Sequence, residues 1–187
     1  MRIIGGKFRG TALAPLGEGD PTAHLRPTSD RVREAIFNLL VNGGHGDPVT
    51  GARVLDLFAG TGALGLEALS RGAARVAFVD DGLTARALLR RNIEITRTMG
   101  VTDVWRRDAT RLGDNRGPGY GLVFLDPPYG KALGEQALSS AVAGHWLDPG
   151  ALVVWEEGTT PLPPPGFDLL DRRKYGDTVV TILRAPE

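Results

Sequence analysis

Residues 54–65, VLDLFAGTGALG, decide the fold. The apolar run that opens this stretch predicts a short strand, and a helical stretch follows its glycines. Gly60, Gly62 and Gly65 complete the pattern G-x-G-x-x-G, in which the backbone approaches a ligand closely. Asp80 stands twenty residues beyond Gly60, after the next apolar run, where a carboxylate can hold a ribose diol. The stretch therefore predicts a nucleotide-binding loop without fixing the nucleotide.

Outward from this loop, short apolar runs alternate with helical stretches. The predicted strands cover residues 54–58, 76–79, 101–105, 122–125 and 151–155. The predicted helices among them cover 63–70, 83–99 and 133–144. Two further strands, 167–174 and 177–184, predict a closing antiparallel hairpin. Because near-continuous apolar strands that alternate with helices form parallel sheets covered on both faces, we expect an α/β, Rossmann-like fold of seven mostly parallel strands.

The first part of the chain lacks this alternation. Residues 1–45 predict an N-terminal extension of a hairpin and a helix, laid against a main domain of residues 46–187. The hairpin is expected within residues 2–10, and Thr28 or Ser29 is expected to cap the helix. The extension is too short to be a separate domain.

Composition excludes several classes of protein. The 187 residues carry 22 Lys and Arg against 22 Asp and Glu, with no cysteine. The absence of cysteine excludes disulfides, cysteine-based zinc sites, iron–sulfur clusters and a thiolate nucleophile, and we expect no metal. No signal-peptide pattern or membrane-length apolar run occurs, so we expect a cytoplasmic protein without membrane contact.

Asp56, inside the first predicted strand, bears on the identity of the ligand. A pyrophosphate site has no use for a carboxylate four residues before the glycine loop, whereas the sulfonium and amino groups of S-adenosylmethionine are both positive. A chain of 187 residues also leaves little room for the substrate domain of a dehydrogenase. These two points favour S-adenosylmethionine over NAD, while a role of Asp56 in tethering the loop stays open.

The catalytic candidates follow the fourth predicted strand, on the edge where the glycine loop also lies. They are Asp126, Pro127, Pro128 and Tyr129. The prolines fix the turn, so Asp126 and a proline carbonyl can accept both hydrogens of one amino group, and Tyr129 offers a flat face for a base. Such acceptors localise the amine lone pair for attack on a sulfonium methyl group. Methylation of a pyrimidine carbon normally needs a thiolate, which this chain lacks, so an exocyclic amine is the favoured target.

Several motifs together resemble the bacterial small-subunit rRNA (guanine-N2) methyltransferases, a family of class I S-adenosylmethionine-dependent methyltransferases. The motifs are RIIGG at 2–6, RG at 9–10, LRPTSDRVRE at 25–34, LDLFAGTGALGLEA at 55–68, DPPY at 126–129 and YGDT at 175–178. The resemblance spans nearly the whole chain. It implies direct methyl transfer to N2 of one guanine in small-subunit rRNA, within a partly or fully assembled particle, by a monomer.

The resemblance also implies which residues hold S-adenosylmethionine. Gly60 and Gly62 would line its methionine part, Asp80 its ribose and Asp108 its adenine amino group. The other implied cofactor residues are Asp56, Phe58, Ala59, Thr61, Asp81 and Ala109. Two departures stand out, because the family more often has Glu at position 80 and a shorter loop than residues 14–24.

The RNA is expected to lie on basic side chains near the glycine loop. The predicted residues are Arg2, Lys7, Arg9, Arg26, Arg31 and Arg33. Because helical residues two positions apart point about 200° apart, Arg31 and Arg33 cannot both face one phosphate track. Replacing Arg26 or Arg31 by Ala is predicted to weaken RNA binding and flatten its salt dependence.

Three alternatives stay open at this point. An adenine-N6 methyltransferase of DNA or RNA would use the same Asp-Pro-Pro-Tyr chemistry, although the motifs in residues 1–34 disfavour it. A dehydrogenase would bind NADH rather than S-adenosylhomocysteine. A non-enzymatic rRNA-binding assembly factor would keep the fold without the chemistry, and the intact tetrapeptide argues against it.

Overall fold

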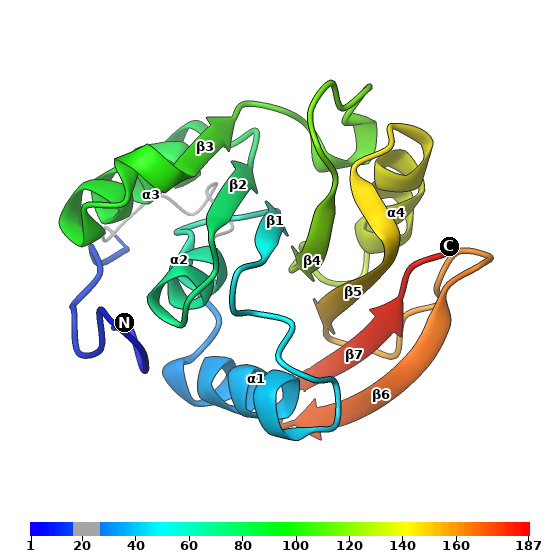
Figure 1. Ribbon diagram of the computed structural model, residues 1–187, viewed down its shortest axis with the longest axis horizontal. Coiled ribbons are helices and arrows are strands. Elements are labelled where there is room, and N and C mark those ends of the chain that lie inside the picture. Colours follow the sequence, from blue (N-terminus) through cyan, green and yellow to red (C-terminus); the bar gives the residue numbers. More distant parts are fainter. Residues whose placement is uncertain (17–26) are drawn as a thin grey trace.

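The computed structural model describes residues 1–16 and 27–187. Its seven strands form one sheet in the order β3-β2-β1-β4-β5-β7-β6 (Figure 1). The strands are β1 (Arg53–Leu57), β2 (Arg75–Val79), β3 (Thr102–Trp105), β4 (Tyr120–Leu125), β5 (Leu147–Glu157), β6 (Asp168–Tyr175) and β7 (Thr178–Arg184). Strands β1 to β5 pair in parallel, and β7 pairs antiparallel with both β5 and β6. The predicted fold class and closing hairpin are confirmed.

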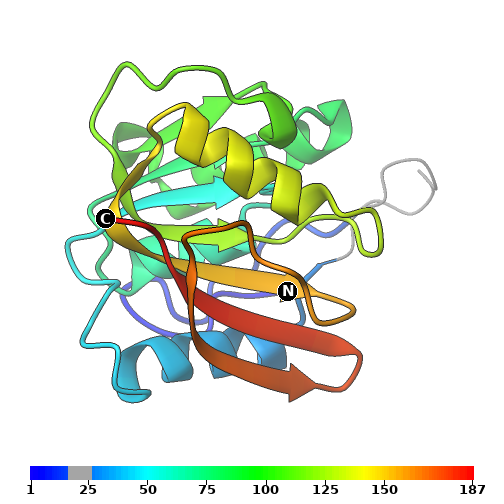
Figure 2. The same cartoon turned by 90° about the vertical axis from the view of Figure 1, so that its right-hand side faces the viewer.

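Helices cover both faces of the sheet, as predicted (Figures 1 and 2). They are α1 (Asp30–Asn42), α2 (Ala63–Ser70), α3 (Leu83–Thr96) and α4 (Leu133–Ala143), with 3-10 turns η1 (Met99–Val101) and η2 (Ala109–Arg111). Side chains of α1, α2 and α3 share one apolar cluster with one face of the strands, and α4 packs on the other face. Alternate strand residues divide between the two clusters, as in β4, where Phe124 belongs to the first and Leu125 to the second.

Element boundaries follow from local backbone chemistry. The Ser29 side chain accepts a hydrogen bond from the Val32 N–H and caps α1, which confirms one of the two predicted caps. Helix α3 ends at Thr96 rather than at residue 99, because Arg97 adopts a left-handed φ of 55°. Strand β5 begins four residues before its predicted start, and its pairing with β4 shifts register to accommodate the early residues.

The expected hairpin of residues 2–10 is present only in reduced form. Arg2 and Ala12 make one isolated antiparallel bridge, and no pair of named strands forms within residues 1–16. The Ile3 N–H donates to the Thr11 carbonyl at 2.9 Å, and Ile3 itself is buried in the core. Residues 1–13 therefore form a loop anchored by the buried apolar side chains of Ile3 and Leu13, and we call it the N-terminal loop.

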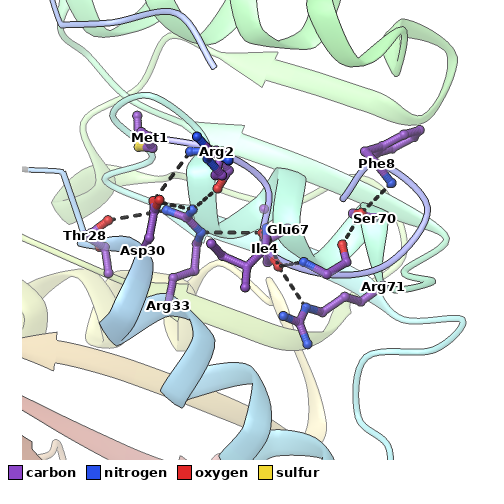
Figure 3. Close-up of polar contacts among 12 residues, drawn as sticks. Met1, Arg2, Ile4, Phe8, Thr28, Asp30, Arg33, Glu67, Ser70 and Arg71 are labelled. Atoms are coloured by element: carbon purple, nitrogen blue, oxygen red, sulfur yellow. Dashed lines mark hydrogen bonds and ion pairs between the residues drawn. The ribbon is translucent and has the colours of Figure 1, made fainter. Parts of the chain in front are cut away.

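Glu67 of α2 fastens the N-terminal loop to the domain (Figure 3). Its carboxylate accepts hydrogen bonds from the Ile4 N–H at 3.0 Å and the Gly5 N–H at 2.9 Å. It also pairs with Arg71 Nε at 2.9 Å and with Arg33 Nε at 3.5 Å. The side chains of Glu67 and Arg33 are fully buried, and Arg71 is partly exposed. One carboxylate thus joins the loop, α1 and α2.

Ser70, at the end of α2, adds a second attachment (Figure 3). Its hydroxyl donates to the Gly5 carbonyl at 2.6 Å and accepts from the Phe8 N–H at 2.9 Å. A Cβ atom at Gly6 would lie 1.9 Å from the Ser70 carbonyl oxygen, so only glycine permits this close approach. Within the described residues, no helix is long and apolar enough to cross a membrane.

Candidate active site

The carboxyl ends of β1, β2 and β4 bring the predicted site residues to one edge of the sheet. Leu57, the last residue of β1, pairs with Val79 of β2 and with Leu125 of β4. Asp80 and Asp126 are the next residues along β2 and β4. In Figure 2, the arrowheads of β1 and β4 point to the side of the molecule where α1 begins. The glycine loop, the acidic residue after β2 and the Asp-Pro-Pro-Tyr turn therefore meet there.

The glycine loop has a backbone that other residues could not adopt without strain. Gly60 and Gly62 have φ values of 58° and 79°. A Cβ atom at Gly62 would lie 2.3 Å from Leu89 Cδ1, and one at Gly65 would lie 2.4 Å from Phe78 Cε1. Phe58, which leads into the loop, also has a positive φ of 58°, which is rare for a bulky residue. The glycines thus serve the tight turn and its packing against α3 and β2.

Asp56 tethers the start of α2. Its side chain is buried, and Oδ2 accepts a hydrogen bond from the Gly65 N–H at 3.0 Å. Burial raises the pKa of Asp56 well above its usual range, the Gly65 N–H opposes this rise, and the negative charge of Asp80 adds to it. The tethering role that the sequence left open is confirmed, and the attraction of a cationic ligand stays a prediction.

Asp80 joins the glycine loop after β1 to the turn that follows β2. Its Oδ2 accepts from the Gly60 N–H at 2.9 Å, and its Oδ1 accepts from the Gly82 N–H at 2.8 Å. Partial burial raises the pKa of Asp80, and these two N–H groups act against the rise. Since each carboxylate oxygen has two lone pairs, Asp80 can still accept the two hydroxyls of a ribose. The residue therefore fits the predicted contact, and its neighbour Asp81 is exposed.

Asp108 lies at the same edge, after β3. Its Oδ1 accepts from the Thr110 N–H at 2.9 Å and from the Thr110 hydroxyl at 2.7 Å, so it caps η2. These hydrogen bonds lower the pKa of Asp108 and keep its exposed carboxylate ionised. Oδ2 can accept from an amino group such as that of adenine. Ala109, next to it, is buried in the cluster under α4.

The Asp-Pro-Pro-Tyr turn is joined to the end of β1, which leads into the glycine loop, and to the segment just before α1. The Asp126 N–H donates to the carbonyl of Leu57, two residues before Ala59, at 3.4 Å. Asp126 Oδ2 lies 3.1 Å from the Thr28 hydroxyl. Pro127 is buried and Pro128 is exposed, so the turn presents one proline to the core and the other to solvent.

Tyr129 is half-buried, with its hydroxyl in a polar cluster. The hydroxyl donates to Glu156 Oε1 at 3.2 Å and lies 3.3 Å from Thr178 Oγ1. A Cβ atom at Gly158 would lie 2.6 Å from Tyr129 Cδ2, so the absence of a side chain there makes room for the ring. The hydroxyl end is held inside the protein, while the ring is partly exposed.

The sequence prediction missed two residues of this cluster. Thr28 was considered only as a helix cap, and its hydroxyl instead lies between Asp126 and Glu156. Glu156 follows Trp155, which pairs with Leu125 immediately before Asp126. An acidic residue at the end of an apolar strand was the signal that selected Asp80 and Asp126, and the same signal applied to β5 would have selected Glu156.

The structure divides the predicted RNA-binding residues. Arg2, Lys7 and Arg9 are exposed on the N-terminal loop, and Arg31 is exposed in the first turn of α1. Arg26 lies outside the described residues.

Arg33 requires a correction, because it is fully buried and cannot contact RNA in this structure. Its guanidinium donates to Asp30 Oδ1 at 2.9 Å, to the Arg2 carbonyl and to the Thr28 carbonyl at 3.4 Å, and it pairs with Glu67. Arg31 and Arg33 lie on different sides of α1, and the side that carries Arg33 faces the core. Arg33 is a structural residue that joins α1 to the N-terminal loop.

Together, the seven-stranded sheet with its closing antiparallel hairpin, the glycine loop after β1 and the acidic residue after β2 define a class I S-adenosylmethionine-dependent methyltransferase. The carboxylates at the sheet edge fit that cofactor, whose ribose and adenine offer hydroxyl and amino donors. The model of the family described as Conserved hypothetical protein 95 matches residues 1–184, and the chain belongs to this family.

Named relatives agree with this assignment. The chain is 38% identical over 183 residues to the Haemophilus influenzae protein named ribosomal RNA small subunit methyltransferase D, with 94% of this chain and 89% of that one covered. It is 36% identical over 173 residues to the Escherichia coli K12 protein of the same name, with coverages of 90% and 82%. The solved structure of the Escherichia coli protein yhhF superposes with a TM-score of 0.82 at 33% identity, with coverages of 100% and 98%.

Proposed function

We propose that this protein transfers a methyl group from S-adenosylmethionine to the exocyclic N2 amine of a specific guanine in small-subunit rRNA. The names of the Haemophilus and Escherichia relatives support the RNA class. The observation that carries the reaction type is the Asp-Pro-Pro-Tyr turn beside the glycine loop, where the Asp126 N–H donates to the carbonyl of Leu57 at the end of β1. The guanine N2 target rests on the motif resemblance.

The side chains of the turn have separate roles in this proposal. The cofactor, when bound, supplies a methyl group on a positively charged sulfur. Asp126 and the carbonyl of Pro127 accept the two hydrogens of the target amine, which directs its lone pair toward that carbon. Tyr129 stacks on the base and holds it in line. With the cofactor bound, the amine nitrogen would take its methyl group as the bond from that carbon to sulfur breaks, and the surplus proton of the amine would leave through the Asp126 carboxylate.

The basic surface assigned to RNA lies on the N-terminal part of the chain. Arg2, Lys7 and Arg9 on the N-terminal loop and Arg31 in the first turn of α1 are exposed cations. Residues 1–45 therefore serve as the RNA-contacting extension, and residues 46–187 as the cofactor-binding catalytic domain. The enzyme acts as a cytoplasmic monomer on rRNA in a partly or fully assembled particle, where the target base is turned outward to reach Asp126.

The decisive experiment incubates the protein with undermethylated small subunits and labelled cofactor, and then maps the modified nucleotide. Label at guanine N2 is expected, and label at adenine N6 would replace the proposal by its closest alternative. Parallel reactions with free rRNA separate the two forms of substrate.

Asp126→Ala should reduce the rate of transfer by about 100-fold or more, because the amine loses an acceptor that organises the transition state. Asp114→Ala is the matched control, since Asp114 is an exposed aspartate in the loop before β4, at the opposite end of that strand from the turn. An Asp126→Ala enzyme as fast as wild type would show that the amine-acceptor role is wrong.

A further inference from the structure

The two functional side chains of the Asp-Pro-Pro-Tyr turn converge on one buried glutamate. Glu156 Oε1 accepts from the Tyr129 hydroxyl at 3.2 Å, and Glu156 Oε2 accepts from the Thr28 hydroxyl at 2.9 Å. The same Thr28 hydroxyl lies 3.1 Å from Asp126 Oδ2. Because a hydroxyl carries one proton and two lone pairs, Thr28 links the two carboxyl groups through a single atom. Any movement of Glu156 is therefore transmitted to Asp126 and Tyr129.

This cluster is shielded from water and mounted on rigid elements. Glu156 is 5% exposed, and Thr28 and Thr178 are each 7% exposed. Glu156 lies in β5, which pairs with β4 on one side, and Glu156 itself pairs with Val180 of β7 on the other. A buried polar group that loses its partner has no water to replace it, so these hydrogen bonds restrict the geometry strongly.

We infer that Glu156 and Thr28 are positioning residues, which orient Tyr129 and Asp126 toward the target base. The inference rests on the proposed function, because it takes those two residues as the base-holding pair. Glu156 acts through the Tyr129 hydroxyl, which Thr178 also contacts, and so restricts rotation of the ring beside Gly158. Thr28, two residues before α1, makes the N-terminal extension part of the catalytic geometry as well as of the RNA-binding surface.

The test uses Glu156→Gln and Thr28→Val, which keep the side-chain shapes. The glutamine keeps one acceptor oxygen and has an amide NH2 group in place of the second oxygen. Either the Tyr129 hydroxyl or the Thr28 hydroxyl then loses its acceptor and must reorient. With undermethylated small subunits as substrate, each variant is expected to lower kcat about 10-fold. A small displacement of Tyr129 or Asp126 would misalign the target amine, and misalignments of this kind slow reactions by such factors. The KM for the particle, the Kd for S-adenosylhomocysteine and the melting temperature should stay close to the wild-type values.

The double variant tests whether the two residues act together. Both single variants interrupt the same Thr28–Glu156 hydrogen bond, so the double variant should be no more than about threefold slower than the slower single variant.

Glu157→Gln is the matched control on the next residue of β5. Glu157 is equally buried, but its two backbone hydrogen bonds, from the Gly130 N–H at 3.3 Å and the Gly158 N–H at 3.0 Å, both use Oε1. A glutamine oxygen can accept both, so kcat should change less than about twofold. Wild-type kcat in Glu156→Gln, an equal fall in Glu157→Gln, or a fall that tracks the melting temperature would each overturn the inference.

Two readouts separate this inference from the proposed function. The value of kcat is measured from labelled methyl groups in any nucleotide of the rRNA. A target other than guanine N2 would therefore contradict the proposed function, while the ratio of variant to wild-type kcat would still test the inference. Crystal structures of the two variants provide a readout that needs no substrate. Displacement of the Tyr129 ring or the Asp126 carboxylate supports the inference, and wild-type positions for both would overturn it.

Discussion

Two buried glutamates, Glu67 and Glu156, are surrounded by very different partners. Glu67 pairs with two arginines and accepts from two backbone N–H groups of the N-terminal loop. Glu156 accepts from the hydroxyls of Thr28 and Tyr129 and is linked through Thr28 to a second carboxyl group. Two guanidinium groups compensate the buried Glu67 carboxylate with full positive charge, whereas the hydroxyl contacts of Glu156 lead to the side chains of the active-site edge.

The difference indicates what each cluster contributes. The Glu67 cluster joins three segments and has its charge balanced, so we expect its removal to lower the stability of the fold. The Glu156 cluster holds side chains at the active-site edge, so we expect its alteration to change the rate with little effect on stability.

The largest effect is expected for Glu67→Ala. The change takes one carboxylate partner from the buried Arg33, which keeps Asp30, and breaking such a buried pair costs about 3–5 kcal/mol in the free energy of unfolding. Two N–H groups of the N-terminal loop also lose their acceptor. Urea denaturation measures the loss, and S-adenosylhomocysteine binding at low temperature should stay close to wild type.

Glu67→Gln provides the graded control for that change. Its amide oxygen can still accept from the N-terminal loop, so the loss of stability should fall between zero and that of Glu67→Ala. If Glu156→Gln lowered the unfolding free energy as much as Glu67→Ala, the Glu156 cluster would also be a stabilising cluster.

Asp56→Asn tests a third buried carboxyl group, whose hydrogen bond comes from the Gly65 N–H rather than from an arginine. Because burial raises its pKa above the usual 3.8, the folded state holds the proton more tightly than the unfolded state. The stability of the wild type should therefore fall as pH rises from about 4 through the raised pKa, and Asn should remove that contribution. At pH 7.5 the variant is expected to melt higher than wild type, by about 2–4 °C for each kcal/mol regained.

The same substitution should weaken binding of S-adenosylmethionine at pH values above the raised pKa of Asp56, where the wild-type carboxylate carries a negative charge that Asn lacks. Differential scanning calorimetry from pH 4 to 8 and titration calorimetry with S-adenosylmethionine check the two expectations separately. A variant that is less stable than wild type at pH 7.5 would contradict the sign derived from the raised pKa.

The arrangement of the sheet could be predicted from sequence because its signals are local. Apolar runs, the glycines of residues 60–65 and the Ser29 cap each act within a few residues of chain. Arg33 was misplaced even though it shares the spacing i, i+3, i+4, i+7 with the buried residues Ile36, Phe37 and Leu40. Its charge concealed the pattern, and its partner Glu67 is 34 residues away in the chain.

The polar contacts of the site were less predictable for the same reason. The Thr28–Glu156 hydrogen bond joins residues 128 positions apart, and the Thr28–Asp126 bond joins residues 98 positions apart. No local pattern specifies such pairs, which depend on how α1 packs beside the end of β5. The register of β5 against β4 would have been enough to predict that Glu156 lies next to the turn. The position of Thr28 beside these residues could be learned only from the structure.

The smallest effect, and the sharpest contrast within one helix, is expected for Arg31→Ala. Arg31 is exposed and Arg33 is buried, although only one residue separates them. Loss of one phosphate contact should weaken RNA binding uniformly and reduce the slope of log K against log salt by about 1, while the free energy of unfolding changes by less than about 0.5 kcal/mol. Arg33→Ala should do the reverse, because its guanidinium is committed to Glu67 and Asp30. Filter binding from 50 to 200 mM salt measures the slope, and an unchanged slope in Arg31→Ala would remove this residue from the RNA-binding surface.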